Sequence, residues 1–215
     1  MNCEKTLSMD LKEKINEWFK TGFPELRDLE NSGFGENLSF KNLCSRTLDH
    51  YFLRDFTINN YGFGFPINKE SLDIISNLSN RILEIGAGSG WLSFLLSKNI
   101  DIIATDIKSV WKNSETNLPI NYFAIEEMDA VSAVEKYPDR DILTCWPTYE
   151  KPWAFESVNK IRSDQILFYI GEGYGGCTAD DSFHDLLDRE FDLINKLNYP
   201  NWPGIHDRLF IYRRK

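Results

Sequence analysis

The sequence predicts an α/β fold: a doubly wound, mostly parallel seven-stranded sheet with a C-terminal antiparallel hairpin, preceded by an N-terminal helical extension. Three observations support this prediction. From about residue 61, short apolar runs typical of buried strands alternate with helix-compatible stretches. A glycine-rich segment directly follows the first of these runs. The last two strand-like runs are joined by residues 198–207, which leave no room for a crossover helix.

Residues 1–60 form the predicted helical extension. Leu11, Ile15 and Trp18 recur at helical spacing between charged residues, which indicates an amphipathic helix. A second apolar pattern with helical spacing runs over residues 40–56. We therefore expect two parts, a helical extension over 1–60 and an α/β domain over 61–215.

Within the expected α/β domain, helices and strands follow one another closely. Asn68 is a good N-cap for a helix that ends near Leu78, because its side-chain oxygen can accept a free backbone N–H. Further helices are expected at 91–96 and 180–189. The strands are expected at 81–85, 101–106, 121–125, 141–145, 165–170, 191–197 and 208–212. The last two strands form the antiparallel hairpin at the edge of the sheet.

The composition is that of an ordinary globular protein, with 42% apolar, 14% aromatic and 27% charged residues, which excludes a collagen-like or wholly disordered chain. Lys and Arg number 24 against 33 Asp and Glu, so the net charge is −9. This acidic balance argues against sequence-independent binding to nucleic acid or to anionic membranes.

The cysteines are too scattered for a metal site. Cys3, Cys44, Cys145 and Cys177 form no CxxC pair and join no histidine cluster, so we expect reduced thiols and neither a metal nor a disulfide framework. The sequence shows no signal-peptide pattern and no apolar run of about 18 residues. We therefore expect a soluble, cytoplasmic protein without a membrane span.

The most informative motif is the segment 84–91, which reads E-I-G-A-G-S-G-W. It lies between an expected strand and an expected helix, at the end of the sheet where open α/β folds bind ligands. Glycines let the backbone approach a ligand closely, and a simple turn would need only one of them. A dinucleotide-binding GxGxxG motif would have its third glycine where Trp91 stands, and a GxxxxGK[ST] phosphate loop is absent.

This glycine segment resembles the cofactor motif of the class I S-adenosylmethionine-dependent methyltransferases. The resemblance implies that Gly86, Gly88 and Gly90 pass beneath the methionine part of the cofactor, and that Glu84 helps to order the loop. It also implies that Asp106, which closes the next expected strand, accepts hydrogen bonds from both ribose hydroxyls. A carboxylate suits this role because it offers two acceptor oxygens to two neighbouring donors.

The resemblance further implies an acidic residue near the end of the third strand, which accepts from the adenine amino group. Asp129 and Ala130 fit that pattern, although Glu126 and Glu127 lie close by and a solvated acidic turn is the alternative interpretation. The full set of cofactor-binding residues that the resemblance implies is Glu84, Gly86, Ala87, Gly88, Gly90, Asp106, Ile107, Asp129, Ala130 and Trp146.

The acceptor site is expected after the fourth strand, where the sequence reads Trp146-Pro147-Thr148-Tyr149. Methyltransferases that act on amino or amide groups often carry [DN]-P-P-[YFW] here, and this chain matches the first proline and the final aromatic. The indole of Trp146 cannot accept a hydrogen bond from an attacking amino group, which argues against methylation of nucleic-acid bases. Trp146 and Tyr149 are expected either to line the cofactor, to stack on a planar substrate, or to pack in the core.

A second glycine-rich loop, 171–176, follows the fifth expected strand. Its Glu172 is a candidate base or binder of a cationic group, with a solvated loop acid as the alternative. Tyr149 and Glu172 are thus the candidate catalytic residues. For the lone histidines His184 and His206, a structural role is the better expectation.

The predicted function is methyl transfer from S-adenosylmethionine to an unidentified acceptor, for which the acidic balance favours a small molecule or a protein over nucleic acid. The enzyme would mainly supply alignment and exclusion of water. Residues 61–66 are a candidate lid, because paired glycines permit a hinge. The alternative function is a catalytically silent, cofactor-binding module that recruits a partner, since an Asp or Asn is missing before Pro147. Trp91 argues against a nicotinamide dehydrogenase.

Overall fold

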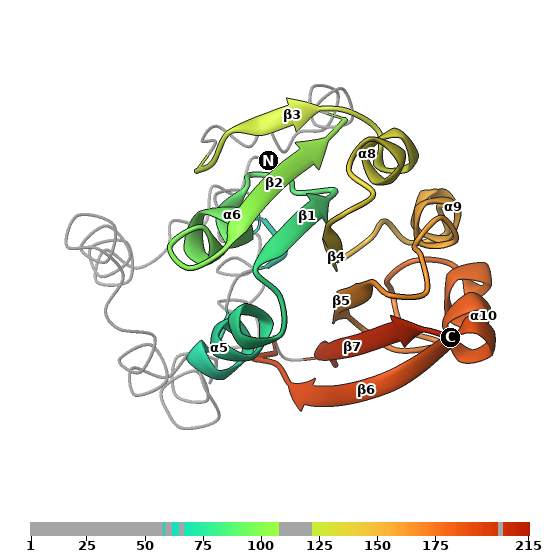
Figure 1. Ribbon diagram of the computed structural model, residues 1–215. Helices are drawn as coiled ribbons and strands as arrows, with labels where there is room; N and C mark the ends of the chain where they lie inside the picture. Colours follow the sequence, from blue (N-terminus) through green and yellow to red (C-terminus); the bar gives the residue numbers. More distant parts are fainter. Residues whose placement is uncertain (1–57, 59–61, 65–66, 108–121, 202–203) are drawn as a thin grey trace, which may run out of the picture. The chain divides into compact units, whose positions relative to one another are not determined.

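The computed structural model describes residues 58, 62–64, 67–107, 122–201 and 204–215 (Figure 1). All of them belong to one compact unit, Thr57–Lys215. The helices predicted within residues 1–60 lie outside the described residues, so the boundary at residue 61 stays a prediction.

The described residues form a seven-stranded sheet with the order β3-β2-β1-β4-β5-β7-β6. The strands are β1 Arg81–Ile85, β2 Asp101–Asp106, β3 Ile125–Glu127, β4 Asp141–Cys145, β5 Ile166–Gly171, β6 Phe191–Asn198 and β7 Arg208–Arg214. Strands β1 to β5 pair in parallel, whereas β7 pairs antiparallel with both β5 and β6. The predicted fold class is confirmed, including the antiparallel hairpin.

Helices cover the sheet on both faces, as a doubly wound fold requires. Figure 1 shows α5 and α6 on one side and α8, α9 and α10 on the other. Their bounds are α5 Lys69–Leu78, α6 Trp91–Leu96, α8 Ala130–Lys136, α9 Trp153–Val158 and α10 Asp181–Glu190. The strand order reverses between β1 and β4, which is the topological switch point at which open α/β sheets bind ligands.

Three helices begin at polar side chains that accept a backbone N–H. Asn68 accepts from Ser71 at the start of α5, as predicted, and Asp129 and Asp180 do the same for α8 and α10. Such caps satisfy backbone donors that have no partner inside the helix. They fix where α8 begins, directly after the carboxyl end of β3.

The core lies between the sheet and the helices α8, α9 and α10. All six residues of β5 are buried. Tyr169 of this strand stacks on Phe210 of β7, with the ring centroids 5.4 Å apart. Phe183 of α10 meets Tyr169 edge-on at 5.0 Å. These rings anchor the hairpin and α10 to the centre of the sheet.

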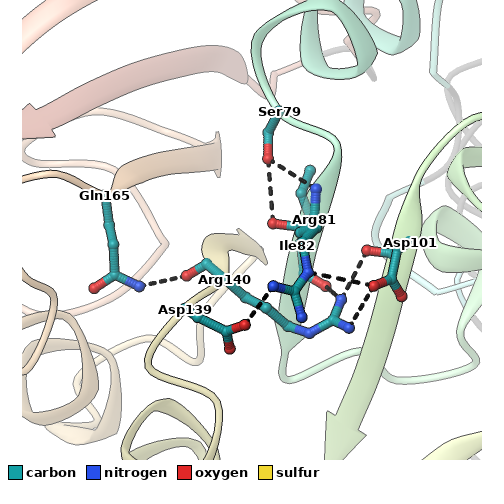
Figure 2. A network of polar contacts seen from close by, with 7 residues as sticks. All are labelled: Ser79, Arg81, Ile82, Asp101, Asp139, Arg140 and Gln165. Carbon is teal, nitrogen blue, oxygen red and sulfur yellow. Dashed lines mark hydrogen bonds and ion pairs between the residues drawn. The ribbon is translucent and has the colours of Figure 1, made fainter.

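A polar network ties the strands together at the amino end of the sheet (Figure 2). The buried guanidinium of Arg140 donates to the carbonyl oxygen of Asp101 at 2.8 Å and to its carboxylate at 2.7 Å. It also donates to the carbonyl of Ile82 at 3.3 Å, while Gln165 donates to the carbonyl of Arg140. The starts of β1, β2, β4 and β5 are thereby held at one level.

One predicted strand is wrong in its position. The sequence predicts a strand over 121–125, but β3 begins at Ile125, where pairing with Ala104 starts. Before that point the backbone bonds elsewhere: the N–H of Tyr122 donates to the carbonyl of Ser89 at 2.9 Å. The residues before β3 therefore pack on the glycine segment rather than on β2.

Candidate functional site

A cavity of about 680 Å³ opens at the carboxyl ends of β1, β2, β3 and β4. In-register pairing places Ile85 beside both Thr105 and Thr144, so three of these strands end at the same level. The lining comes from the glycine segment, the ends of these strands, the segment 62–64 and the start of α9. The volume falls in the range of pockets that enclose small-molecule ligands and cofactors.

The glycines of segment 84–91 adopt backbone conformations that other residues rarely take. Gly86, Gly88 and Gly90 have φ values of 67°, 56° and 74°. A Cβ on Gly86 would lie 2.9 Å from the ring of Trp153, and one on Gly90 would lie 2.9 Å from Phe123. Left-handed geometry and close packing therefore both require glycine at these two positions.

Glu84 lies buried beneath this loop. One carboxylate oxygen accepts the backbone N–H of Ser93 at 3.1 Å and also its hydroxyl, which connects β1 to the first turn of α6. Burial raises the pKa of Glu84 to about 7, against the lowering effect of the Ser93 hydrogen bonds and with a further increase from the charge of Asp106. The group thus gains or loses its proton near neutral pH.

Asp106 is buried at the end of β2 and faces the glycine segment. Its Oδ2 accepts the backbone N–H of Gly88 at 2.8 Å. This bond holds the loop against the end of β2. A carboxylate has about four lone-pair sites, so a bond from the loop is compatible with further donors from a ligand.

The acidic turn after β3 contributes Met128, Asp129 and Ala130 to the cavity lining. Asp129 caps α8 by accepting the N–H of Ser132 at 2.9 Å, and this bond holds its pKa below the ordinary value. Glu126 instead pairs with Lys136 and Tyr137 and is not part of the lining. The structure therefore brings Asp129, rather than Glu126, to the cavity.

Trp146 lines the cavity directly after β4 and is held on several sides. Its φ is 51°, a strained value for a residue with a side chain, and its backbone N–H donates to Ile170 at 2.9 Å. The indole Nε1 donates to Asp207 at 2.9 Å. Phe63 stacks on the indole with a centroid distance of 4.9 Å and an interplanar angle of 13°.

Tyr149 and Cys145 also line the cavity, and both remain neutral near pH 7. Tyr149 is 52% exposed at the cavity mouth, and the charge of Glu150 raises the pKa of its phenol. Burial raises the pKa of the Cys145 thiol well above its usual value, with smaller contributions from Asp207 and Glu84. Neither group is suited to act as a base.

Glu172, the second candidate catalytic residue, does not line the cavity. Its two oxygens accept the backbone N–H groups of Cys177 at 2.8 Å and His206 at 2.9 Å, so it joins the loop after β5 to the hairpin connection. Burial raises the pKa of Glu172, but the hydrogen bonds outweigh burial and leave the pKa below its ordinary value. The sequence places Glu172 and Tyr149 in one cleft, whereas the structure brings only Tyr149 there.

The two histidines have structural surroundings. His184 is buried and its Nε2 lies 3.1 Å from the carbonyl of Thr178, while His206 is exposed with Nδ1 3.5 Å from Glu172. Neither lines the cavity. Of the predicted lid, Gly62, Phe63 and Gly64 are described, and all three belong to the lining.

Sequence reasoning missed several residues that build the cavity. Trp153 and Glu156 enter from α9, and Asp207 orients Trp146 from the hairpin connection. A proline before Trp153 is a weak signal of a helix start, but no local pattern places that helix opposite the glycine segment. Asp207 gives no sequence signal, because its partner lies 61 residues earlier.

The charges of the cavity are unbalanced. Among the described residues that line it, Glu84, Asp106, Asp129 and Glu156 carry carboxyl groups and Lys151 carries the one ammonium. This excess of carboxyl acceptors suits a ligand with positive charge and hydroxyl or amino donors. The described residues contain no group of three His, Cys, Asp or Glu side chains arranged to hold a metal. Among the same residues no helix is long and apolar enough to cross a membrane.

A scan against protein-family models finds no match for this chain, and a search of curated proteins finds none either. Solved structures of similar fold include a SAM-dependent methyltransferase from Anabaena variabilis, with 13% identity and a TM-score of 0.48, covering 68% of this chain and 83% of that one. Magnesium protoporphyrin IX methyltransferase from Synechocystis matches with 12% identity and a TM-score of 0.47, covering 84% and 99%. An rRNA methylase from Streptococcus thermophilus matches with 12% identity and a TM-score of 0.42, covering 67% and 94%.

These similarities concern the fold. The strand order by itself defines the doubly wound class with an antiparallel hairpin. The observed strand order belongs to the fold class that the sequence predicts, and at the level of the fold class the prediction is confirmed.

Proposed function

We propose that this chain is an S-adenosylmethionine-dependent methyltransferase whose acceptor is a small molecule or a protein side chain. The observation that supports it most is the E-x-G-x-G-x-G segment, whose three glycines have left-handed φ and whose Gly88 is bonded to the buried Asp106. A dinucleotide-binding loop would have glycine at position 91, where Trp91 is buried against Tyr122.

The lining residues fit the chemical groups of this cofactor. Asp106 is suited to accept from the ribose hydroxyls while it also holds Gly88, and Asp129 with Ala130 is suited to the adenine amino group. The carboxyl of Glu84 and the excess of acids suit the ammonium and sulfonium charges. When bound, the cofactor supplies an activated methyl group that leaves a neutral sulfur.

The chain's own contribution is then alignment and exclusion of water. Trp146, Trp153 and Phe63 give the β4 side of the cavity an apolar lining. Tyr149 and Cys145 stay neutral, so an acceptor that carries its own lone pair fits better than one that needs a strong base.

Calorimetry with S-adenosylmethionine, S-adenosylhomocysteine and NAD tests the proposal. We expect both adenosyl compounds to bind and NAD not to bind comparably; tight NAD binding alone would refute the proposal. Asp106→Ala should weaken adenosyl binding about tenfold to a hundredfold, because a hydrogen bond to a charged group contributes about 1.5–3 kcal/mol.

Asp106→Asn sharpens this test. Its amide oxygen can still accept the N–H of Gly88, so the loop keeps its support while one charge and one acceptor are lost. We expect an affinity between those of the wild type and Asp106→Ala. Asp164→Asn, an exposed acid outside the cavity, is the matched control. Wild-type affinity in a folded Asp106→Ala would move the ribose site elsewhere.

The second candidate function is a catalytically silent module that binds the cofactor and recruits a partner. The observation that favours it is Trp146, whose single polar atom is engaged by Asp207 and cannot accept from a nucleophile. A screen of small-molecule, protein and RNA acceptors that detects S-adenosylhomocysteine decides between the two. Product formation with any acceptor supports the enzyme, and tight cofactor binding without product supports the silent module.

A further inference from the structure

Four aromatic residues line the β4 side of the cavity, and we refer to Phe63, Trp146, Tyr149 and Trp153 as the aromatic wall. They come from three separate places: the segment before α5, the loop after β4 and the first position of α9. The glycine segment and the acids Asp106 and Asp129 lie at the ends of β1, β2 and β3 instead. Trp153 packs on Gly86, so the aromatic wall borders the glycine segment within the cavity.

The aromatic wall is rigid where it meets Trp146. The indole is fixed through Asp207 at 2.9 Å, the backbone bond to Ile170 and the stack on Phe63. The backbone next to Phe63 is anchored as well, because the hydroxyl of the buried Tyr199 donates to the carbonyl of Gly64 at 2.9 Å. Rings that are immobilised in advance lose little conformational entropy when a ligand packs on them.

The indole of Trp146 leaves little scope for hydrogen-bond recognition. The N–H of Trp146 is directed to Asp207, so the indole offers ring surface rather than a donor. The charged residues beside the wall are Lys151 and Glu156, whose charges cancel. Apart from the acids proposed to hold the cofactor, the described lining residues therefore offer no net positive charge to a phosphate group.

We propose that the acceptor is a planar aromatic small molecule without phosphate groups, held by stacking on the aromatic wall. This inference rests on the proposed function, since it places the acceptor opposite the cofactor. Flat rings match the flat faces of Trp and Tyr, and such pairs gain more than the burial of apolar area alone provides. Nucleotide acceptors, which carry phosphates, are disfavoured by the same charges.

The test uses three probes with one skeleton: 2-naphthol, its saturated counterpart 2-decalol, and 2-naphthyl phosphate. Equilibrium dialysis with the full chain is run with saturating S-adenosylhomocysteine and again without it. Hydrophobic burial alone predicts that decalol binds at least as well as naphthol. Stacking predicts that naphthol binds about threefold to tenfold more tightly than decalol, and repulsion predicts that the phosphate binds more weakly still.

Two exposed tyrosines provide a matched pair of variants. Tyr149 belongs to the aromatic wall and is 52% exposed, whereas Tyr174 is 63% exposed and does not line the cavity. Tyr149→Leu keeps apolar bulk but removes the ring, so we expect the preference for naphthol over decalol to fall about threefold. Tyr174→Leu should leave that preference unchanged.

The outcomes separate this inference from the proposed function. Three results would each overturn the inference of a planar acceptor, even when S-adenosylhomocysteine binds. They are equal binding of naphthol and decalol, tighter binding of the phosphate, and equal effects of the two tyrosine variants. Failure of S-adenosylhomocysteine to bind would overturn the proposed function, and the dialysis without it then still judges the aromatic wall as a site for planar ligands.

Discussion

Replacing Glu84 with glutamine should remove a pH dependence from the stability of the fold. Burial is the main reason that the pKa of Glu84 rises from its ordinary value of 4.5 to about 7. The folded state therefore holds this proton more tightly than the unfolded state does. The resulting stabilisation is complete below pH 4.5 and is lost as the pH rises through about 7.

The size of the effect follows from the two pKa values. Raising the pKa from 4.5 to about 7 corresponds to about 3 kcal/mol of unfolding free energy, at about 1.4 kcal/mol per pKa unit. Glutamine is nearly isosteric, and its carbonyl oxygen can still accept the N–H of Ser93. The unfolding free energy of the wild type relative to Glu84→Gln should therefore fall by about 3 kcal/mol between pH 4.5 and pH 8.

Urea unfolding of both proteins at several pH values, followed by circular dichroism, measures this difference. Comparing two proteins at each pH cancels the contributions of the titrating groups that do not interact with Glu84. Glu70→Gln, an exposed acid in the first turn of α5, controls for the loss of one negative charge. If the difference in unfolding free energy between the wild type and Glu84→Gln stays constant from pH 4.5 to 8, the reasoning is refuted.

Two further substitutions test the geometry of the sheet ends. Gly86→Ala should destabilise the fold by about 1–3 kcal/mol in thermal unfolding, because its Cβ would lie 2.9 Å from Trp153 at a φ of 67°. Gly173→Ala is the control, because its Cβ would have an ordinary 3.6 Å contact. Equal losses of stability in the two variants would contradict the assigned packing of Gly86 on Trp153. Arg140→Met should cost about 1.5–3 kcal/mol in urea unfolding, because Ile82 and Asp101 lose a charged donor. Arg162→Met, at an exposed ion pair, should change stability by no more than about 0.5 kcal/mol, and a matching loss there would count against the network.

The elements that the sequence predicts correctly are those with local causes. The cap at Asn68, the buried strand at Arg81–Ile85 and the glycine segment each depend on residues within a few positions of one another. The position of Asp106 at the end of β2 follows from the same reasoning, since the end of a strand is a local feature. Its bond to Gly88 then follows from the parallel pairing of β1 with β2.

The expectations that failed depend on partners far along the chain. Nothing near Glu172 in the sequence indicates that the backbone N–H of His206, 34 residues later, will donate to one of its carboxylate oxygens. The start of β3 shifted because Tyr122 bonds to Ser89 instead of continuing the strand. Trp146 lines the cavity, as one of the alternatives from the sequence has it, but its orientation is fixed by Asp207 and Phe63 rather than by its neighbours in sequence.

The strand order also has a consequence for how a nascent chain completes this domain. β6 precedes β7 in the chain, yet β7 lies between β5 and β6 in the sheet. During synthesis, β6 therefore emerges before the strand with which it pairs, and the buried residues of β5 keep an open edge until β7 follows. Asp207 immediately precedes β7, so the ribosome delivers the partner of Trp146 together with the strand that closes the sheet.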